Sequence, residues 1–257
     1  MRASPHSPDG KHALSPRPVR LLAASLAAAV ALSLAAAAPA AAAPAAPVAT
    51  VKAAVVAPRQ LRFGMRGGDV MGLQHRLGVL KYDIGTANGV FGSETRNAII
   101  AFQKVNGLER DGVVGPKTRA KLARPLTPTP RYKRKGISLE ANLDKQVLLV
   151  FSEGKIRLIV NISSGSERKY TVEDVTAVAH TPHGYFHLQR YIPGWRKSRL
   201  GMLWRPVYFD GGFAIHGSSS VPPYPASHGC IRTPIVTQNR LLASGLLRVG
   251  RPLYVYG

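Results

Sequence analysis

The sequence predicts two domains of different class, a small all-α module of three helices followed by a mainly β domain. Three observations predict this order. Apolar residues recur at helical spacing over residues 61–122. Apolar and polar residues alternate from residue 137 onwards, which is typical of strands. Residues 123–136 between them carry three prolines and a basic run, which disfavour helix.

Residues 1–43 are predicted to be an export segment that precedes both domains. Two arginines precede an uncharged apolar run over residues 21–38, and small residues follow it around Ala41. This order is typical of a secretory signal peptide. The run is also about the minimum length that spans a bilayer, so a retained membrane anchor is the alternative. In both cases the body of the protein is expected outside the cytoplasmic membrane, joined through a flexible linker at residues 44–60.

The module predicted over residues 61–122 begins with two amphipathic helices. Their inward-facing residues are expected to be Val70, Leu73, Leu77 and Leu80, then Ala98, Phe102 and Val105. Ser93 is the expected N-cap of the second helix, and Gly107 is suited to close it.

An internal repeat predicts how the module turns. The stretch "NGVFGSETR" at residues 88–96 matches "DGVVGPKTR" at residues 111–119, and Pro116 falls in the first turn of the third helix. With "LRFGMRGGDVMGLQHRLG" ahead of them, these stretches resemble the peptidoglycan-binding domain found beside many bacterial wall enzymes. The resemblance implies binding of glycan or stem peptide. A three-helix bundle without a ligand is the alternative.

The linker at residues 123–136 contains the cationic cluster "RYKRK". A solvated tether is the favoured interpretation, and contact with anionic polymers of the cell wall is the alternative. The whole chain carries 35 Lys and Arg against 13 Asp and Glu, a formal charge of +22. Such a charge favours anionic partners. Nucleic acid would explain it, but not the predicted export segment, so no nucleic-acid partner is expected.

The second domain, residues 137–257, is predicted from alternating strands. "KQVLLVFSEGKIRLIVNISSG" predicts a hairpin that turns at Glu153 and Gly154. "PHGYFHLQRY", "GGFAIHG" and the terminal "LYVYG" predict further strands, and "PIVTQNRLLASGLL" predicts one short helix.

The only cysteine of the chain, Cys230, lies in "YPASHGCIRTP". A nucleophilic cysteine needs a base or cation, oxyanion donors and access. His228 is two residues away, and His216 lies 14 residues upstream at the end of a predicted strand. Gly229 lacks side-chain bulk, so a substrate carbonyl can approach backbone N–H groups there. We therefore predict a reactive thiol with His216 as its base, rather than a buried structural cysteine.

A metal site is the competing interpretation of the histidines. His183 and His187 have helical ligand spacing, but Pro182 and Gly184 interrupt the segment and it is predicted to be a strand. The chain has no second cysteine to serve as a ligand. Neither a metal nor an organic cofactor is expected.

The segment "AIHGSSSVPPYPASHGCIRTP" resembles the signature of the L,D-transpeptidase (YkuD-like) catalytic domain, within a wider match over about residues 137–256. The resemblance implies a β-sandwich, with Cys230 as nucleophile and His216 as proton acceptor and donor. It implies supporting roles for His228 and Arg232. A backbone carbonyl near Gly217 is a candidate for holding the imidazole tautomer. The base precedes the nucleophile in the chain, unlike in papain-like wall peptidases.

The family's activity implies attack on the stem tetrapeptide of peptidoglycan, release of D-Ala and a 3→3 cross-link. The candidate oxyanion and loop residues are Ser227, Gly229 and Gly217; the candidate substrate-binding residues are Arg232, Tyr208 and Trp195. Peptidoglycan stem peptides and glycan are the expected partners, and the cell wall is the expected location. A carboxypeptidase that passes the same thioester to water, and a wall-binding protein with an inactive catalytic fold, are the alternatives. The sequence does not identify the acceptor amine.

Overall fold

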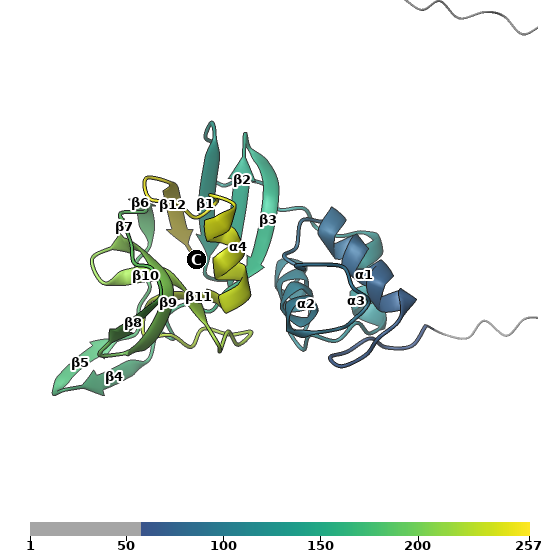
Figure 1. The fold of residues 1–257 in the computed structure, drawn as a ribbon, viewed down its shortest axis with the longest axis horizontal. Helices are drawn as coiled ribbons and strands as arrows, with labels where there is room; N and C mark the ends of the chain where they lie inside the picture. Colours follow the sequence, from purple (N-terminus) through teal and green to yellow (C-terminus); the bar gives the residue numbers. More distant parts are fainter. Residues whose placement is uncertain (1–57) are drawn as a thin grey trace, which may run out of the picture. The chain divides into compact units, whose positions relative to one another are not determined.

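The computed structural model describes residues 58–257. The predicted export segment, residues 1–43, and most of the linker 44–60 lie outside the described residues. The described residues belong to one compact unit that contains three helices, two larger β-sheets, a separate hairpin and a fourth helix (Figure 1). No helix within residues 58–257 is long and apolar enough to cross a bilayer.

The helical module follows the predicted order of helices. Its helices are α1 (Gly68–Val79), α2 (Ser93–Val105) and α3 (Pro116–Ala123). The predicted inward-facing residues are buried, apart from Leu80, which is half-buried at the C-cap of α1. The predicted N-cap of α2 is wrong by one residue, because Gly92 is the extended N-cap and its carbonyl accepts the Arg96 N–H. Pro116 is the first residue of α3, as predicted.

The sequence repeat corresponds to a repeated hydrogen-bond pattern. The buried Gln74 accepts the Gly89 N–H and donates to the Val90 carbonyl. The buried Gln103 does the same one repeat later, with the Gly112 N–H and the Val113 carbonyl. Gly89 and Gly112 have φ values of 72° and 73°, a region that favours glycine. The repeat therefore builds two equivalent turns, each fastened to a glutamine of the preceding helix.

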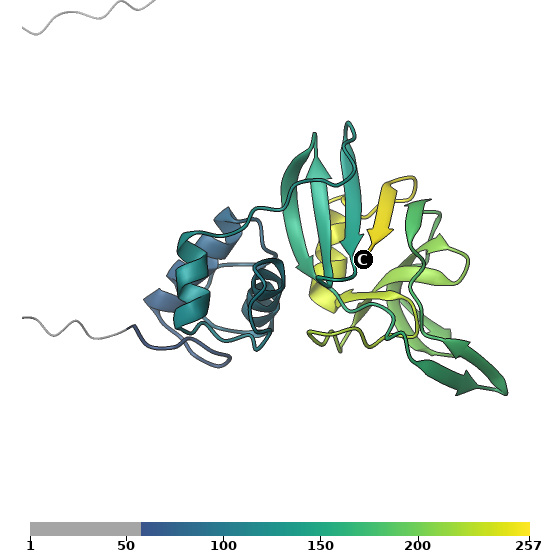
Figure 2. The same ribbon diagram turned by 180° about the vertical axis from the view of Figure 1, so that it is seen from behind.

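The second domain is a β-sandwich, as predicted. One sheet has the order β3-β2-β1-β12-β6, and its strands are β1 (Ile137–Asn142), β2 (Val147–Ser152), β3 (Lys155–Asn161), β6 (Gly184–His187) and β12 (Pro252–Tyr256). The other has the order β11-β10-β9-β7, with β8 also paired to β9, and its strands are β7 (Arg190–Tyr191), β8 (Trp195–Ser198), β9 (Gly201–Asp210), β10 (Phe213–Ser218) and β11 (Ile231–Pro234). The helix α4 (Ile235–Ala243) packs on β9, β10 and β11. The hairpin of β4 (Lys169–Val172) and β5 (Val175–Val178) projects from the sandwich (Figures 1 and 2).

The core lies between the two sheets. Leu139, Val150 and Val255 of the first sheet cluster with Val207 and Ile215 of the second, and all are buried. The predicted turn at Glu153 and Gly154 joins β2 to β3, with φ values of 49° and 71°, which suit a two-residue hairpin turn.

Strand β2 is buried on both faces. Leu148 and Val150 face the sandwich core, whereas Leu149 and Phe151 belong to a second apolar cluster that includes Phe102 of α2. This accounts for the uninterrupted apolar run "VLLVF" in the sequence, which is typical of a strand covered on both sides. The helical module thus supplies the cover for the outer face of this sheet.

The end of the second linker is held by the sandwich. The Arg131 and Tyr132 N–H groups donate to the carboxylate of the buried Glu140, at 3.1 and 2.9 Å. The Tyr132 ring lies 5.4 Å from that of Tyr185. These residues are therefore fixed to the sandwich through their backbone, while Arg131, Tyr132 and Lys133 remain exposed to solvent, as the interpretation as a solvated tether expects.

Candidate active site

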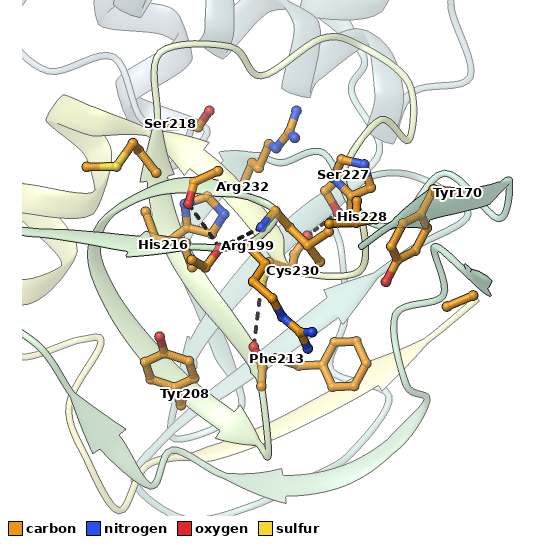
Figure 3. A pocket seen from close by; sticks show the side chains of 18 of the residues that line it. Tyr170, Arg199, Tyr208, Phe213, His216, Ser218, Ser227, His228, Cys230 and Arg232 are labelled. Carbon is orange, nitrogen blue, oxygen red and sulfur yellow. Dashed lines mark hydrogen bonds between the residues drawn. The ribbon is translucent and has the colours of Figure 1, made fainter. Parts of the chain in front are cut away.

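A cavity of about 620 Å³ contains the predicted nucleophile and its predicted base (Figure 3). His216, Cys230 and Arg232 line one part of it, at the junction of β10 and β11. Apolar side chains, Val175 and Met202 among them, line the part formed by the β4–β5 and β8–β9 hairpins. The cavity therefore combines a polar reactive end with an apolar wall.

Strand register brings Cys230 and His216 together. Strands β10 and β11 are parallel, and His216 is paired with Arg232. Cys230 lies in the bend directly before β11, two residues ahead of Arg232. The thiol and the imidazole therefore line the same cavity, although 14 residues separate them in the sequence.

His216 is held as a neutral base. Its side chain is buried, with the residue 5% exposed, and its Nδ1 lies 2.9 Å from the Gly217 carbonyl. The pKa of His216 is lowered to about 4, chiefly by burial and to a smaller extent by the charge of Arg232, while the bond to Gly217 acts in the opposite direction. Because the carbonyl only accepts, Nδ1 carries the proton and Nε2 has a free lone pair. The ring can therefore accept a proton at neutral pH.

Cys230 is held as a thiol. Burial raises its pKa, while the Ala214 N–H and the charge of Arg232 act in the opposite direction. Its Sγ lies 3.8 Å from the Gly212 carbonyl, a long contact for a thiol donor. The resting pair is therefore uncharged, and attack on a substrate requires that His216 remove the proton.

The turn that carries the cysteine is fixed by Ser227. The buried Ser227 hydroxyl donates to the Cys230 carbonyl at 2.5 Å and accepts the Gly229 N–H at 3.0 Å. Gly229 has φ 132°, and a Cβ there would lie 2.6 Å from the Phe213 ring. Backbone conformation and packing thus require glycine at this position. The sequence had suggested only that glycine gives a substrate access to the backbone here.

Comparison with known proteins agrees with this geometry. Residues 137–244 match the L,D-transpeptidase catalytic domain family, and residues 66–122 match a putative peptidoglycan binding domain. The crystal structure of an L,D-transpeptidase from Xylanimonas cellulosilytica is 44% identical; the match covers 78% of this chain and 99% of that chain, with a TM-score of 0.75. This chain belongs to the L,D-transpeptidase family.

A shorter match involves a curated protein of another name. The N-acetylmuramoyl-L-alanine amidase CwlM of Mycobacterium tuberculosis is 44% identical over 52 residues, which cover 20% of this chain. The match spans only 13% of the length of that relative. It concerns a small segment, whereas the match to the Xylanimonas L,D-transpeptidase extends over both domains.

The remaining predicted residues of this L,D-transpeptidase lie in or near the cavity, with one exception. His228 and Tyr208 line it, and the His228 ring packs edge-on against Tyr170 at 4.8 Å between centroids. Trp195 does not line the cavity; it is 50% exposed on β8 and its ring lies 5.0 Å from that of Trp204. The expected role of Trp195 in substrate binding therefore stays a prediction.

Gly217 acts through its backbone. A Cβ at this position would lie 2.8 Å from the Trp204 ring, so the strand packs tightly there. Its carbonyl holds the His216 ring, as the sequence hypothesis about the tautomer proposed.

Several lining residues of the cavity were not anticipated from the sequence. Tyr170 and Arg199 reach it from the β4–β5 and β8–β9 hairpins, and Phe213 from the start of β10. The side chains of Arg199 and Glu173 approach to 3.5 Å where the two hairpins meet. No local motif marks these residues, because only the pairing of distant hairpins brings them to the cysteine.

Proposed function

We propose that this L,D-transpeptidase cross-links peptidoglycan stems through a thioester on Cys230. The observation that supports this most is the neutral, buried His216, whose tautomer is fixed by Gly217 and which lines the same cavity as the cysteine. This arrangement suits transfer of the thiol proton to Nε2 during attack.

The proposed reaction has two steps. In the first, His216 takes the Cys230 proton, and the sulfur attacks the carbonyl carbon of the third stem residue. The bond to the terminal D-Ala breaks, and the imidazolium returns the proton to the leaving amine. In the second, the side-chain amine of another stem attacks the thioester, loses a proton to His216, and the thiol is restored. The product is a 3→3 cross-link.

The backbone around Cys230 is proposed to stabilise the oxyanion. Ser227 engages the Gly229 N–H at 3.0 Å, so that group must leave the hydroxyl before it can donate to a substrate oxygen. The Ala214 N–H is already directed at the sulfur. The Cys230 N–H is therefore the first candidate donor, with Gly229 joining on substrate binding.

The charges in the cavity suit an anionic peptide. Arg199 and Arg232 both line it, and guanidinium groups match carboxylate geometry. A stem peptide carries free carboxylates, and its small side chains suit the apolar wall near Val175.

Export and wall association are proposed from the sequence. Residues 1–43 support export, through a cleaved signal or a retained anchor, and the net charge of +22 supports attraction to anionic wall polymers. Peptidoglycan is the partner of both domains, because each domain matches a family of that chemistry.

The test is incubation with a purified disaccharide tetrapeptide, followed by mass spectrometry of the products. Cys230→Ala and His216→Ala are expected to abolish D-Ala release and dimer formation, whereas His228→Ala retains part of the activity. His187→Ala, an exposed histidine of β6 outside the cavity, is the matched control. Dimer formation by Cys230→Ala would refute the mechanism. Reactions without an amine acceptor measure the carboxypeptidase alternative, and a carbapenem adduct on Cys230 would exclude an inactive fold.

A further inference from the structure

The loop that joins His216 to Cys230 is fastened to the helical module. Residues 219–226, here called the 219–226 loop, leave β10 and lead into the cysteine turn, and Ser218 and Ser220 at its start line the cavity. We propose that Asn161 and Arg110 are positioning residues through which the module holds this loop, and so shapes the substrate site. The effect on turnover rests on the proposed function, whereas the effect on the loop itself does not.

Asn161 connects the loop to α2. It is buried at the end of β3, and its Oδ1 accepts from Lys104 Nζ at 2.5 Å. Its Nδ2 donates to the Asn97 Oδ1 at 2.8 Å and to the Val221 carbonyl at 3.3 Å. The Val221 carbonyl can only accept, so the Nδ2 end of the amide must face the loop and Oδ1 faces Lys104 of the helix.

Lys104 is itself placed by the sandwich. It is 2% exposed, and its Nζ also donates to the carbonyls of Gln146 and Ile162 at 3.0 and 2.9 Å. Three oxygen acceptors therefore surround the buried Nζ. Burial, with a smaller contribution from the charge of Arg110, lowers the pKa of Lys104 to about 6. A buried lysine with this set of partners fixes α2 on the sheet.

Arg110 makes a direct contact with the loop. Its Nη1 donates to the Pro223 carbonyl at 3.1 Å, and its Nη2 donates to the Asp144 carbonyl at 3.2 Å. The guanidinium therefore bridges the loop and the β1–β2 turn. The sandwich holds the end of the loop through the Ala226 N–H, which donates to the Ser164 carbonyl at 3.0 Å.

The module is also joined to the element that follows the cysteine strand. Arg240 of α4 pairs with Asp83 at 2.8 Å and contacts Glu94 of α2. Thr237 of α4 donates to Asp83 as well, at 2.5 Å. Because α4 begins directly after β11, the module contacts the chain on both sides of Cys230. Contacts at both ends make the module a fixed support of the site rather than a tethered appendage.

Release of the loop is expected to weaken substrate binding and to leave the thiol chemistry intact. The His216–Gly217 bond and the Ser227 contacts do not involve the module. The wall near Ser218 and Ser220 does depend on where the loop lies. The signature of a positioning role is therefore a rise in KM with little change in kcat.

Two variants of the full chain test the proposal. Arg110→Gln removes the bond to Pro223. Asn161→Asp keeps the shape and the Lys104 partner but cannot donate to Val221. Each is expected to raise KM for the tetrapeptide substrate about tenfold, the equivalent of one hydrogen bond, with kcat nearly unchanged. Arg110→Lys, which keeps the charge but cannot bridge two carbonyls, is expected to recover part of the effect.

Hydrogen exchange of the 219–226 loop provides a readout independent of activity. The amides of Ala226 and Ser227, which both bond to Ser164, are expected to exchange about tenfold faster in Arg110→Gln. Arg124→Gln, an exposed arginine at the C-cap of α3, is the matched control and should leave exchange and KM unchanged.

The outcomes separate the two proposals. Unchanged hydrogen exchange in both Arg110→Gln and Asn161→Asp would overturn the positioning role. It would also be overturned if these variants lowered kcat and the melting temperature but left KM unchanged. If the wild-type protein forms no product, the proposed function fails, and the exchange rates still decide whether the module holds the loop.

Discussion

The pH dependence of Cys230 acylation tests the neutral resting pair most directly. The reactive form requires an unprotonated His216, so the acylation rate must rise with pH through the pKa of that ring and then level off. Burial sets this pKa at about 4, against an ordinary value of 6.5. The acid limb is therefore expected near pH 4.

The difference is large at mildly acidic pH. At pH 5.5 about 97% of a base with pKa 4 is unprotonated, against about 9% of a base with pKa 6.5. The shift corresponds to about 3 kcal/mol that disfavours the imidazolium in the folded protein. The same shift makes the stability of the fold depend on pH. Between pH 6.5 and 4 the His216 ring is protonated in the unfolded chain but not in the folded protein, so the free energy of unfolding falls as the pH falls through that window.

The assay is the rate of carbapenem adduct formation on Cys230, followed by intact mass from pH 3.5 to 8. Arg232→Met is the informative variant, because loss of the nearby positive charge should move the acid limb to higher pH while burial still holds it below 6.5. His216→Ala should show no such limb. An acid limb at pH 6.5 in the wild-type protein would refute the argument that burial keeps the base neutral.

Three further substitutions test packing around the site by urea unfolding. Gly229→Ala places a Cβ 2.6 Å from the Phe213 ring at a φ of 132°. It should lower the free energy of unfolding by about 2 kcal/mol and slow acylation of Cys230, and unchanged stability would contradict this prediction. Arg240→Met leaves Asp83, whose side chain is 10% exposed, without its cation, and should cost about 3 kcal/mol; a stabilised variant would refute the pairing. Phe102→Ala leaves a cavity at a fully buried position against β2 and should lower the free energy of unfolding by about 3–5 kcal/mol. A loss under 1 kcal/mol would contradict the packing of Phe102 in the apolar cluster between the helical module and β2.

Periodicity in the sequence predicted part of the fold, and the β-sandwich itself was implied by the family resemblance. The helical stripe that contains Val70 and Leu77 and the alternation in "LYVYG" each reflect one buried face, so spacing alone identifies them. The cap of α2 was harder to place. Ser93 has the favoured chemistry, but Gly92 before it adopts the extended cap conformation, and a single sequence does not distinguish the two positions.

The site was predictable where a motif lies within one stretch of chain. Cys230, His216 and the Gly217 carbonyl all belong to the same segment, and strand pairing folds that segment onto itself. Tyr170 and Arg199 come from hairpins whose position beside the cysteine depends on the pairing of distant strands, so no local pattern indicates them.

The attachment of the helical module was not predictable from local sequence. Lys104 lies in an amphipathic helix between buried residues, and a lysine in such a place is normally solvated. Only the tertiary structure supplies the three oxygens that allow its burial. The apolar run of β2 was the one available signal, because a strand with no polar face must be covered on both sides.

Burial of the site has two consequences that act together. It lowers the pKa of His216 and raises that of Cys230, so proton transfer from sulfur to nitrogen is unfavourable before a substrate is bound. Oxidation and disulfide exchange require the thiolate, so the raised pKa of Cys230 disfavours both reactions at the only cysteine of the chain. The energy that opposes charge separation must then be supplied by contacts formed during attack, above all by N–H groups directed at the oxyanion. The reactivity of Cys230 is therefore expected to be selective for carbonyl compounds that fill the cavity, and low towards small oxidants that do not.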